Sequence, residues 1–387
     1  MKNNVLIVGG GMVGAAAAVE LARQGCQVTI IENNPIEASA ILGGDQVDIR
    51  VSAINRFSEA LLDKLGAMPL IRASRHAPYH QLEAYEQNSE HLLFDKDEVS
   101  ASHLGHLVEN NIIQAALWAQ FEAHMINVVK VSDAPIAVEQ HLSSIELVYP
   151  EQRFSADLLI AADGGRSQLR SLSGIGVTGW QYQQHCMGIL IKLDAPQQVK
   201  TWQEFKPTGP IAFLPMQAPY ANLIWYHHSS ELKRLQGLSK AELKEAVLEH
   251  FFELPGDFEI EHSAVFPLAR QHANQYSIGR LVLVGDAAHT INPLAGQGVN
   301  LGFKDVAALG GCLLGCDDVG ELARLHQYEK MRRKDNLLMM SMMDACYFGF
   351  SNELKPLKSL RSLALKLANN AGPLKREVLK HAMGGSF

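Results

Sequence analysis

The first thirty residues constrain the fold of this chain more than any other segment. Four consecutive apolar residues, Val5 to Val8, are typical of a strand that is buried on both faces of a parallel sheet. A glycine-rich run, 9–14, follows it, and then come a helix-like segment of small residues, 15–24, and a β-rich segment, 27–31. This strand–turn–helix–strand order is a βαβ unit, so we predict an α/β fold that opens with a Rossmann-like domain.

The glycine-rich run contains the pattern G-x-G-x-x-G between a strand and a helix, which is the context in which it binds a dinucleotide pyrophosphate. The first glycine permits a tight turn, the second lets the phosphates approach the backbone, and the third lets helix and strand pack closely. The helix N-terminus adds N–H donors, and an acidic residue after the second strand can bind a ribose. A glycine turn that binds nothing is the alternative. The expected contacts are Gly9, Gly11, Met12, Val13, Gly14 and Glu32.

A second motif, in 281–302, distinguishes between dinucleotides. A buried strand ends in Gly285-Asp286, and the loop NPLAGQGVN and a helix follow. An aspartate at the end of such a strand can accept hydrogen bonds from the ribityl hydroxyls of a flavin, and the helix N-terminus favours the negative charge of the reduced ring. A capping aspartate would explain Asp286 alone but not the Pro-x-x-Gly-x-Gly loop. The motif therefore favours FAD, with expected contacts at Gly285, Asp286, Pro293, Gly296, Gln297, Gly298 and Asn300.

A third motif, Asp163-Gly164, follows the strand-like segment 157–162 and would by itself be an ordinary turn. In this order and spacing, however, the three motifs resemble the class A flavoprotein monooxygenases, the group that includes para-hydroxybenzoate hydroxylase. The resemblance implies that Asp163 and Gly164 support both FAD and the reduced nicotinamide. It also implies that Arg50 contacts the flavin and that Asn110 lies near the cofactor.

Within that class, the string GDAAHTINPLAGQGVNLG at 285–302 is similar to the ubiquinone-biosynthesis hydroxylases, as is the segment 50–54. Four further strings, at 180–182, 201–205, 212–215 and 225–226, are similar to the members that hydroxylate a polyprenyl demethoxyubiquinol. The resemblance extends nearly from end to end. It implies non-covalent FAD, NAD(P)H and O2 as co-substrates, a flavin C4a-hydroperoxide, and a lipid-tailed quinol as substrate.

Three alternatives stay open beside this interpretation. The first is a sister hydroxylase acting at another position of the same ring, because its flavin motifs would look identical. The second is a flavin reductase that inserts no oxygen, and the third is a non-catalytic FAD-containing assembly subunit. The resemblance also leaves open the oligomeric state and the choice between NADH and NADPH.

The predicted fold is para-hydroxybenzoate hydroxylase-like. We expect a discontinuous FAD-binding domain, an inserted antiparallel-sheet domain for the substrate, and a C-terminal helical segment. Alternating apolar and polar residues predict the strands of the second domain, and apolar periodicity predicts the helices. The expected limits are 1–75, 101–180 and 270–353 for the FAD domain, 76–100 and 181–269 for the substrate domain, and 354–387 for the last segment. The expected strands are 157–162, 185–193, 211–217, 221–227 and 281–285, and the expected helices are 57–65, 109–124, about 239–252, and from 321 onward.

The residues that would surround the substrate are harder to choose. The pocket candidates are Phe213, Pro215 and Trp225 from the second-domain sheet, with Pro293 and Leu294 from the flavin loop. A quinol ring is already activated by its hydroxyls, so we assign no catalytic base. Of the histidines considered for that role, His289 lies inside the flavin motif, where a structural or cofactor-orienting role is the better interpretation; the others are His80, His227 and His228.

Composition excludes several other classes of protein. The net charge is −7, which argues against a general affinity for nucleic acid. No apolar run approaches the roughly 20 residues that span a bilayer, so we predict a cytoplasmic chain, either free or peripheral at the inner face of the membrane. The five scattered cysteines suit a reducing compartment. Cys312 and Cys316 lie four residues apart, but no matching pair completes a metal site, so we predict core packing and no metal.

The last part of the chain has a composition of its own. Residues 355–387 carry seven Lys or Arg and one Glu, a net charge of +6. We predict either a peripheral contact with anionic lipid or a biosynthetic complex through this basic segment, or a helical cap on the flavin domain. A methionine-rich stretch before it predicts either an adaptable apolar tunnel for a polyprenyl tail or ordinary core packing; its members are Met339, Met340, Met342 and Met343.

Overall fold

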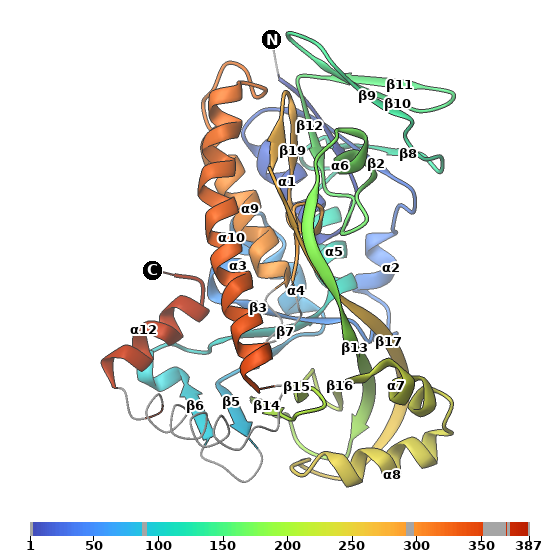
Figure 1. The fold of residues 1–387 in the computed structure, drawn as a ribbon, viewed down its shortest axis with the longest axis vertical. Coiled ribbons are helices and arrows are strands. Elements are labelled where there is room, and N and C mark those ends of the chain that lie inside the picture. The colour runs from blue at the N-terminus through green and yellow to red at the C-terminus, as the bar shows by residue number, and fades with distance from the viewer. Residues whose placement is uncertain (1–2, 87–90, 292–297, 351–368, 370–371, 386–387) are drawn as a thin grey trace.

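The computed structural model describes residues 3–86, 91–291, 298–350, 369 and 372–385. Two sheet regions are stacked along the longest axis, and helix α10 (Leu322–Phe350) runs beside both of them (Figure 1). The described residues include no helix that is both long and apolar enough to cross a bilayer.

The upper region is built on a six-stranded sheet in the order β18-β19-β12-β1-β2-β8. Its strands are parallel except for the edge strand β18, which runs antiparallel to β19. The expected return of 157–162 and 281–285 to the first strand's sheet is confirmed, because β12 pairs with both β1 and β19. The bounds are β1 (Asn4–Val8), β2 (Gln27–Glu32), β8 (Asn127–Lys130), β12 (Leu158–Ala161), β18 (Ser277–Ile278) and β19 (Leu281–Leu283).

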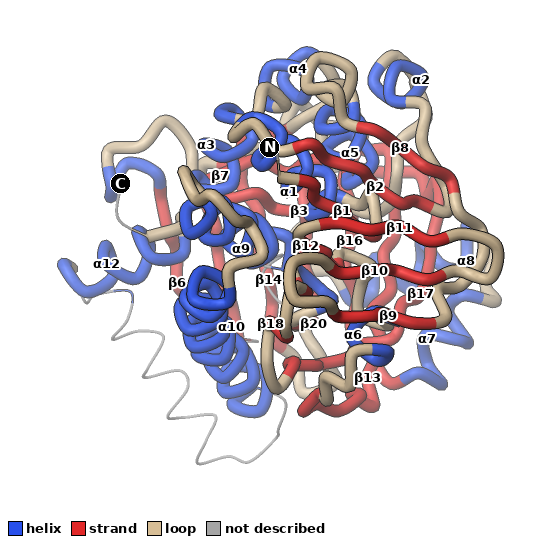
Figure 2. Tube along the Cα trace, turned by 90° about the horizontal axis from the view of Figure 1, so that it is seen from above, coloured by secondary structure: helices blue, strands red, loops and turns tan. Residues whose placement is uncertain are grey.

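Helices pack against this sheet through small side chains. In α1 (Met12–Arg23) the run Ala15 to Ala18 is fully buried, which lets α5 (Asn110–Trp118) and α9 (Gly298–Leu313) approach closely. Seen from above, α9 and α10 lie to one side of the parallel strands (Figure 2). Helix α3 (Arg56–Lys64) begins where the Asn55 side chain accepts the N–H of Ser58. The shorter helices are α2 (Ala38–Leu42), α4 (Met68–Ala73) and α6 (Gln168–Leu172).

The expected helix 109–124 is too long. Helix α5 ends at Trp118, and residues 119–125 form turns that finish at Met125 with φ of 53°. Phe121 still reaches the main core from this turn, which explains why the apolar spacing extended beyond the helix.

Two small antiparallel sheets flank the main one. The first has the order β3-β7-β4 and carries the segments next to the cleft described below; the second, β9 to β11, lies beside the parallel strands (Figure 2). Their bounds are β3 (Val51–Asn55), β4 (Ala77–Tyr79), β7 (Gly105–Glu109), β9 (Ala137–Gln140), β10 (Ile145–Val148) and β11 (Arg153–Ala156), with the short helix η1 (Lys96–Val99) before β7.

The lower region is an eight-stranded sheet in the order β20-β17-β13-β16-β15-β14-β5-β6, antiparallel except for β14 and β5. Helix α8 (Lys240–His250) lies below this sheet and α7 (Ser229–Gln236) lies beside β13 and β17 (Figure 1), and Ser239 and Glu242 form a capping box at the start of α8. The predicted antiparallel sheet and its helix are confirmed. The bounds are β5 (Gln81–Glu86), β6 (His91–Asp95), β13 (Val177–Leu193), β14 (Lys200–Phe205), β15 (Ile211–Pro215), β16 (Tyr220–His228), β17 (Phe258–Ala273) and β20 (His289–Thr290).

The two long strands β13 and β17 connect the regions (Figure 1). The expected domain limits at 180 and 269 therefore fall inside continuous strands, and the division of the chain into domains stays a prediction.

The described part of the C-terminal segment packs against the rest of the protein. In α12 (Pro373–Ala382) and just after it, Leu379 and Met383 are buried against β4 and β7. Lys375 pairs with Glu98 at 2.7 Å. These contacts are those of a helical cap, although residues 355–368, 370–371 and 386–387 of the predicted basic segment lie outside the described residues.

The methionine-rich stretch is divided between core and surface. Met340 is buried with Ile291 and Leu301, and Met339 packs against the same cluster, whereas Met342 is 48% exposed. Cys312 is buried in the main core and Cys316 packs against it, as expected for core residues.

Candidate functional site

In the glycine-rich turn after β1, Gly9 and Gly14 have no room for a side chain. Gly9 has φ of 101°, and a Cβ there would lie 2.3 Å from the carbonyl oxygen of Ala162. A Cβ on Gly14 would lie 1.9 Å from the carbonyl oxygen of Gly9. Gly11 has no atom within 4 Å of such a position, so its backbone is open to a ligand.

A cleft runs on both sides of this turn. Its first compartment, of about 530 Å³, is lined by Gly9, Glu32, Asp163 and Arg166 among others. Its second compartment, of about 590 Å³, reaches the lower sheet. The two share Gly11, Ala162 and Gly164, so together they form one elongated site of the shape that a dinucleotide needs. Predicted contacts in the second compartment are Met12, Val13, Gly14, Arg50, Asn110, Asp286 and Gly298.

Glu32 shapes the turn as well as the cleft. Its carboxylate accepts the N–H of Gly10 at 2.6 Å and that of Asn34 at 2.9 Å. Trp118 Nε1 donates to the Gly10 carbonyl at 2.7 Å, a contact that the sequence motif does not reveal. The turn is therefore held rigidly on both of its backbone faces.

Asp163 offers an unused acceptor. Its Oδ2 caps α6 by accepting the N–H groups of Gln168 at 2.8 Å and Leu169 at 3.2 Å. Its Oδ1 is buried and accepts no hydrogen bond within the described residues. An orphaned buried oxygen is costly, so this atom fits a ligand hydroxyl in the cleft.

Asp286 lies in the short helix η2 (Gly285–Ala287), and its side chain lines the second compartment. Asp286 is open to the cleft, but the protein atoms crowded around its carboxyl, together with the nearby Asp305, raise the pKa of that group. Gly285 does not line the cleft; with φ of 58° it packs against Val13, and a Cβ would come within 3.1 Å of it.

A buried polar network supports this strand end from behind. Asp305 of α9 accepts hydrogen bonds from the backbone N–H of Gly285 at 3.0 Å and from Nε of Arg332 at 2.9 Å. It also accepts a hydrogen bond from Nδ2 of Asn336 at 3.1 Å and forms an ion pair with His289. Burial alone would raise the pKa of Asp305, but His289 and Arg332 hold it below its ordinary value. His289 is thus a structural partner of the motif, in agreement with the interpretation preferred from sequence.

Asn300 corrects the sequence interpretation. Its side chain is 1% exposed and lines neither compartment. Oδ1 accepts from the N–H of Asn55 at 3.0 Å and from Oγ of Ser58 at 2.6 Å, and Nδ2 donates to the Ala53 carbonyl at 2.8 Å. Asn300 therefore connects α9 to β3 and α3, and its side chain is occupied by these contacts within the protein.

The pocket candidates Phe213, Pro215 and Trp225 also need correction, because none of them lines the cleft. Phe213 stacks on Trp202 with ring centroids 6.1 Å apart, and Trp225 packs edge-on to Phe251 at 5.5 Å, both in the core beneath the sheet. Successive strand residues point to opposite faces, so the cleft receives the other set. The lining residues missed from sequence include Ile49, Cys186, Gly188, Asn222, Ile224, Phe266 and Leu268.

Of the remaining predicted site residues, Arg50 is placed at the edge of the cleft and four others are not described by the structure. Arg50 lies at the rim with its side chain 63% exposed, and its carbonyl accepts the N–H of Asn110 at 2.9 Å. Pro293, Leu294, Gly296 and Gln297 lie outside the described residues. No histidine lines either compartment in the part of the chain that the structure describes, which leaves His80, His227 and His228 away from the cleft.

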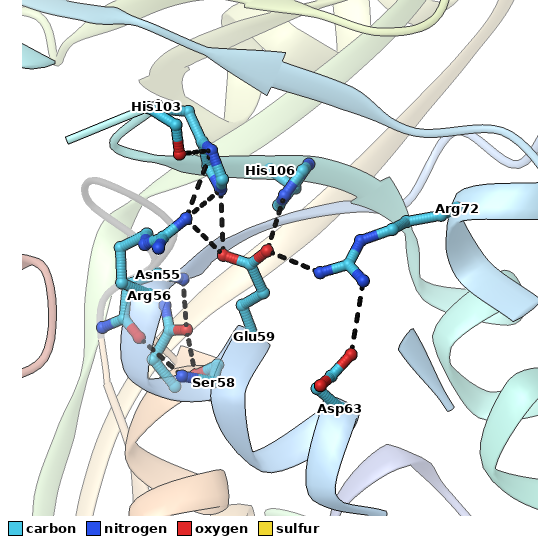
Figure 3. Close-up of polar contacts among 10 residues, drawn as sticks. Asn55, Arg56, Ser58, Glu59, Asp63, Arg72, His103 and His106 are labelled. Carbon is cyan, nitrogen blue, oxygen red and sulfur yellow. Dashed lines mark hydrogen bonds and ion pairs between the residues drawn. The ribbon is translucent and has the colours of Figure 1, made fainter. Parts of the chain in front are cut away.

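A second polar cluster lies outside the cleft, between α3 and β7 (Figure 3). Glu59 pairs with Arg56 and Arg72, each at 3.0 Å, and with His103 at 2.9 Å and His106 at 3.2 Å. Burial would raise the pKa of Glu59, but hydrogen bonds from the two histidines hold it far below its usual range. The donor set resembles a metal site. However, the two guanidinium groups already neutralise the carboxylate, so the cluster suits a structural ion pair.

Comparison with known proteins agrees with this geometry. A family model described as FAD binding domain matches residues 2–340. The 3-demethoxyubiquinol 3-hydroxylase of Escherichia coli strain K12 is 43% identical over 386 residues, covering 98% of both chains. The ubiquinone hydroxylase UbiL of Rhodospirillum rubrum is 33% identical, covering 98% of this chain and 89% of that protein. The structure of p-nitrophenol 4-monooxygenase PnpA from Pseudomonas putida DLL-E4 superposes with a TM-score of 0.79 at 19% identity, over 100% of this chain and 99% of that one, which supports the fold.

The fold and the two-compartment cleft define the class as a flavoprotein monooxygenase with a para-hydroxybenzoate hydroxylase-like architecture. Within that class, the chain belongs to the FAD-dependent hydroxylases of ubiquinone biosynthesis. Its cofactor is FAD, with NAD(P)H and O2 as the co-substrates typical of the class.

Proposed function

We propose that this chain hydroxylates the ring of a polyprenyl demethoxyubiquinol. The observation that carries the proposal is the 43% identity, over 98% of both chains, to the Escherichia coli 3-demethoxyubiquinol 3-hydroxylase. The second compartment supports it, because one wall is built from apolar residues of β13, β16 and β17 that suit a substituted aromatic ring.

The residues of the cleft have distinct tasks in this proposal. The backbone around Gly11 and the N-terminus of α1 would receive the pyrophosphate of FAD, Glu32 would hold a ribose, and Asp163 and Asp286 would accept hydrogen bonds from hydroxyl groups of the cofactor. Bound FAD supplies the redox and oxygen-transfer chemistry, and the protein orients the ring against it.

The wall built from β13, β16 and β17 would keep water out of the second compartment. Ile224, Phe266 and Leu268 line the second compartment with apolar surface. A dry site protects reactive species from hydrolysis and strengthens the electrostatic contacts within it. No residue of the described lining is an obvious strong base, which suits a quinol whose hydroxyls already activate the ring.

The proposal extends to location and partners. We place the chain in the cytoplasm, in peripheral contact with the inner face of the membrane, because a lipid-tailed quinol resides in the bilayer. The basic segment 355–387 is the proposed contact for anionic lipid or for other proteins of the pathway, and no nucleic acid is involved. Removing the last 33 residues, 355–387, should lower the membrane-bound fraction in a vesicle sedimentation assay; an unchanged fraction would refute the membrane contact.

The test of the function is a quinone profile by mass spectrometry, in cells that lack the protein and in the same cells with it restored. Accumulation of demethoxyubiquinone that disappears on restoration supports the proposal. Accumulation of a less substituted intermediate would instead assign the chain to a sister step, which the similarity to the Rhodospirillum rubrum ubiquinone hydroxylase keeps as the second candidate. The control is an Asp286→Ala variant, which should restore nothing if the flavin site carries the activity.

A further inference from the structure

Asn222 of β16 is a polar residue in the apolar wall of the second compartment. It is 1% exposed, and its neighbours in that wall include Cys186, Ile224 and Leu268. A buried amide is costly unless both of its ends find partners, so its surroundings are informative.

The orientation of this amide is determined by its nitrogen. Nδ2 donates to the carbonyl oxygen of Ile49, which belongs to the irregular segment 43–50 and lines the second compartment. A carbonyl can only accept, so the atom facing Ile49 must be the amide nitrogen and not Oδ1. The other end of the amide therefore presents an acceptor.

That acceptor has no partner among the residues that the structure describes. Oδ1 of Asn222 is buried and accepts no hydrogen bond from any residue in the described part of the chain. A buried acceptor left unpaired costs free energy, which a ligand donor would recover. Besides the position of Asn222 in the wall of the compartment, the unpaired oxygen thus indicates that a ligand binds beside it.

Gly188 of the neighbouring strand β13 leaves room for such a ligand. Its backbone is not in the left-handed region, and a Cβ there would lie 3.6 Å from Oδ1 of Asn222 and 3.5 Å from Cγ1 of Ile49, which are ordinary contacts. The fold therefore does not demand glycine at this position. The missing side chain keeps space open next to the unpaired oxygen, and Gly188 lines the compartment.

We propose that Oδ1 of Asn222 accepts a hydrogen bond from a ring hydroxyl of the substrate, and that Asn222 thereby selects the quinol over its oxidised quinone. This inference rests on the proposed function. A hydroquinone hydroxyl can donate to Oδ1, whereas a quinone carbonyl would place one acceptor against another. The residue acts in substrate recognition and takes no part in moving electrons.

The test measures binding of two ligands that differ only in oxidation state. A short-tailed demethoxyubiquinol and the corresponding quinone are titrated, without oxygen, into the FAD-loaded protein and into Asn222→Leu, which has a similar size and no acceptor. We expect Asn222→Leu to bind the quinol about tenfold more weakly, the loss of roughly one hydrogen bond, and to bind the quinone at least as well as the parent does. Equal weakening of both ligands, or no weakening of either, would overturn the proposal.

Two further variants separate recognition from structure. Asn222→Asp keeps an acceptor oxygen but cannot donate to Ile49, so it should retain the preference for the quinol even if the segment 43–50 loosens. Loss of the preference in this variant would mean that the contact with Ile49 is what matters, and would overturn the assignment. Gly188→Ala fills the adjacent space, and we expect it to weaken both ligands together.

The outcome also distinguishes this inference from the function on which it rests. If the parent protein hydroxylates the quinol but Asn222→Leu keeps the parent's discrimination, only the role of Asn222 is wrong. If the parent hydroxylates no quinol of this class, the proposed function fails and the inference fails with it.

Discussion

The pair Asp305 and Arg332 gives the sharpest test of how the flavin motif is supported. Both side chains are buried, at 0% and 5% exposure, and Nε of Arg332 lies 2.9 Å from Oδ1 of Asp305. Asp305→Asn preserves the shape but removes the negative charge and leaves the guanidinium without its main counter-ion. Breaking a buried pair in this way costs about 3–5 kcal/mol of the free energy of unfolding.

The corresponding shift in melting temperature follows from the size of the protein. Unfolding entropies are about 2.1 cal/mol/K per residue, or roughly 0.8 kcal/mol/K for 387 residues, so the expected fall in Tm is about 4–6 °C. The assay is thermal unfolding of the FAD-loaded protein, followed by circular dichroism. FAD retention should fall as well, because Asp305 also accepts the N–H of Gly285, next to Asp286.

A double-mutant cycle and a matched control identify the cause. The double variant Asp305→Asn/Arg332→Met removes both charges, and we expect it to lose about 1–3 kcal/mol less than the sum of the single variants. The control is Asp318→Asn, which breaks the 2.7 Å pair with Arg280 where Asp318 is 46% exposed, and which should cost less than about 1 kcal/mol. If Asp305→Asn is no more destabilising than Asp318→Asn, the network does not support the motif as argued.

Three further predictions test separate parts of the account. Burial lowers the pKa of His272 to about 4, so the folded chain keeps this histidine neutral at pH values where the unfolded chain, with a pKa near 6.5, is already protonated. The free energy of unfolding should therefore fall by up to about 3 kcal/mol as the pH is lowered from 6.5 to 4. His272→Gln should flatten that slope in urea titrations, and an identical slope would refute the prediction. Trp225→Ala should cost about 3–5 kcal/mol of stability with little change in KM, because the ring lies in the core; a large rise in KM at unchanged stability would return Trp225 to the substrate pocket. Gly9→Ala should weaken FAD binding at least about tenfold in fluorescence titrations, since its Cβ would meet the Ala162 carbonyl, and normal FAD binding would contradict the close approach.

Local motifs predicted the parts of the site that depend on local geometry. The tight turn at Gly9 and the close packing at Gly14 follow from steric rules that act within a few residues, and the aspartate after β19 follows from the direction of a parallel strand. The same is true of the parallel sheet and of the antiparallel second sheet, whose strands carry distinct apolar patterns.

What the sequence could not determine depends on which face of an element meets which neighbour. Alternation along β16 separates Trp225 from Ile224, but nothing local says that the face with Ile224 lines the cleft and the face with Trp225 packs on Phe251. Asn300 fits a flavin motif by position, yet its partners Asn55 and Ser58 are more than 240 residues away. Such pairings are determined by tertiary packing and not by spacing.

The most direct test of the central claim is to follow the fate of oxygen in the purified protein. The FAD-loaded chain is supplied with NAD(P)H, a short-tailed demethoxyubiquinol and isotopically labelled O2, and the products are analysed by mass spectrometry. The account predicts a hydroxylated quinol that carries one labelled oxygen atom for each NAD(P)H consumed. Consumption of NAD(P)H without labelled product would contradict it and would favour a flavin reductase that shares this fold.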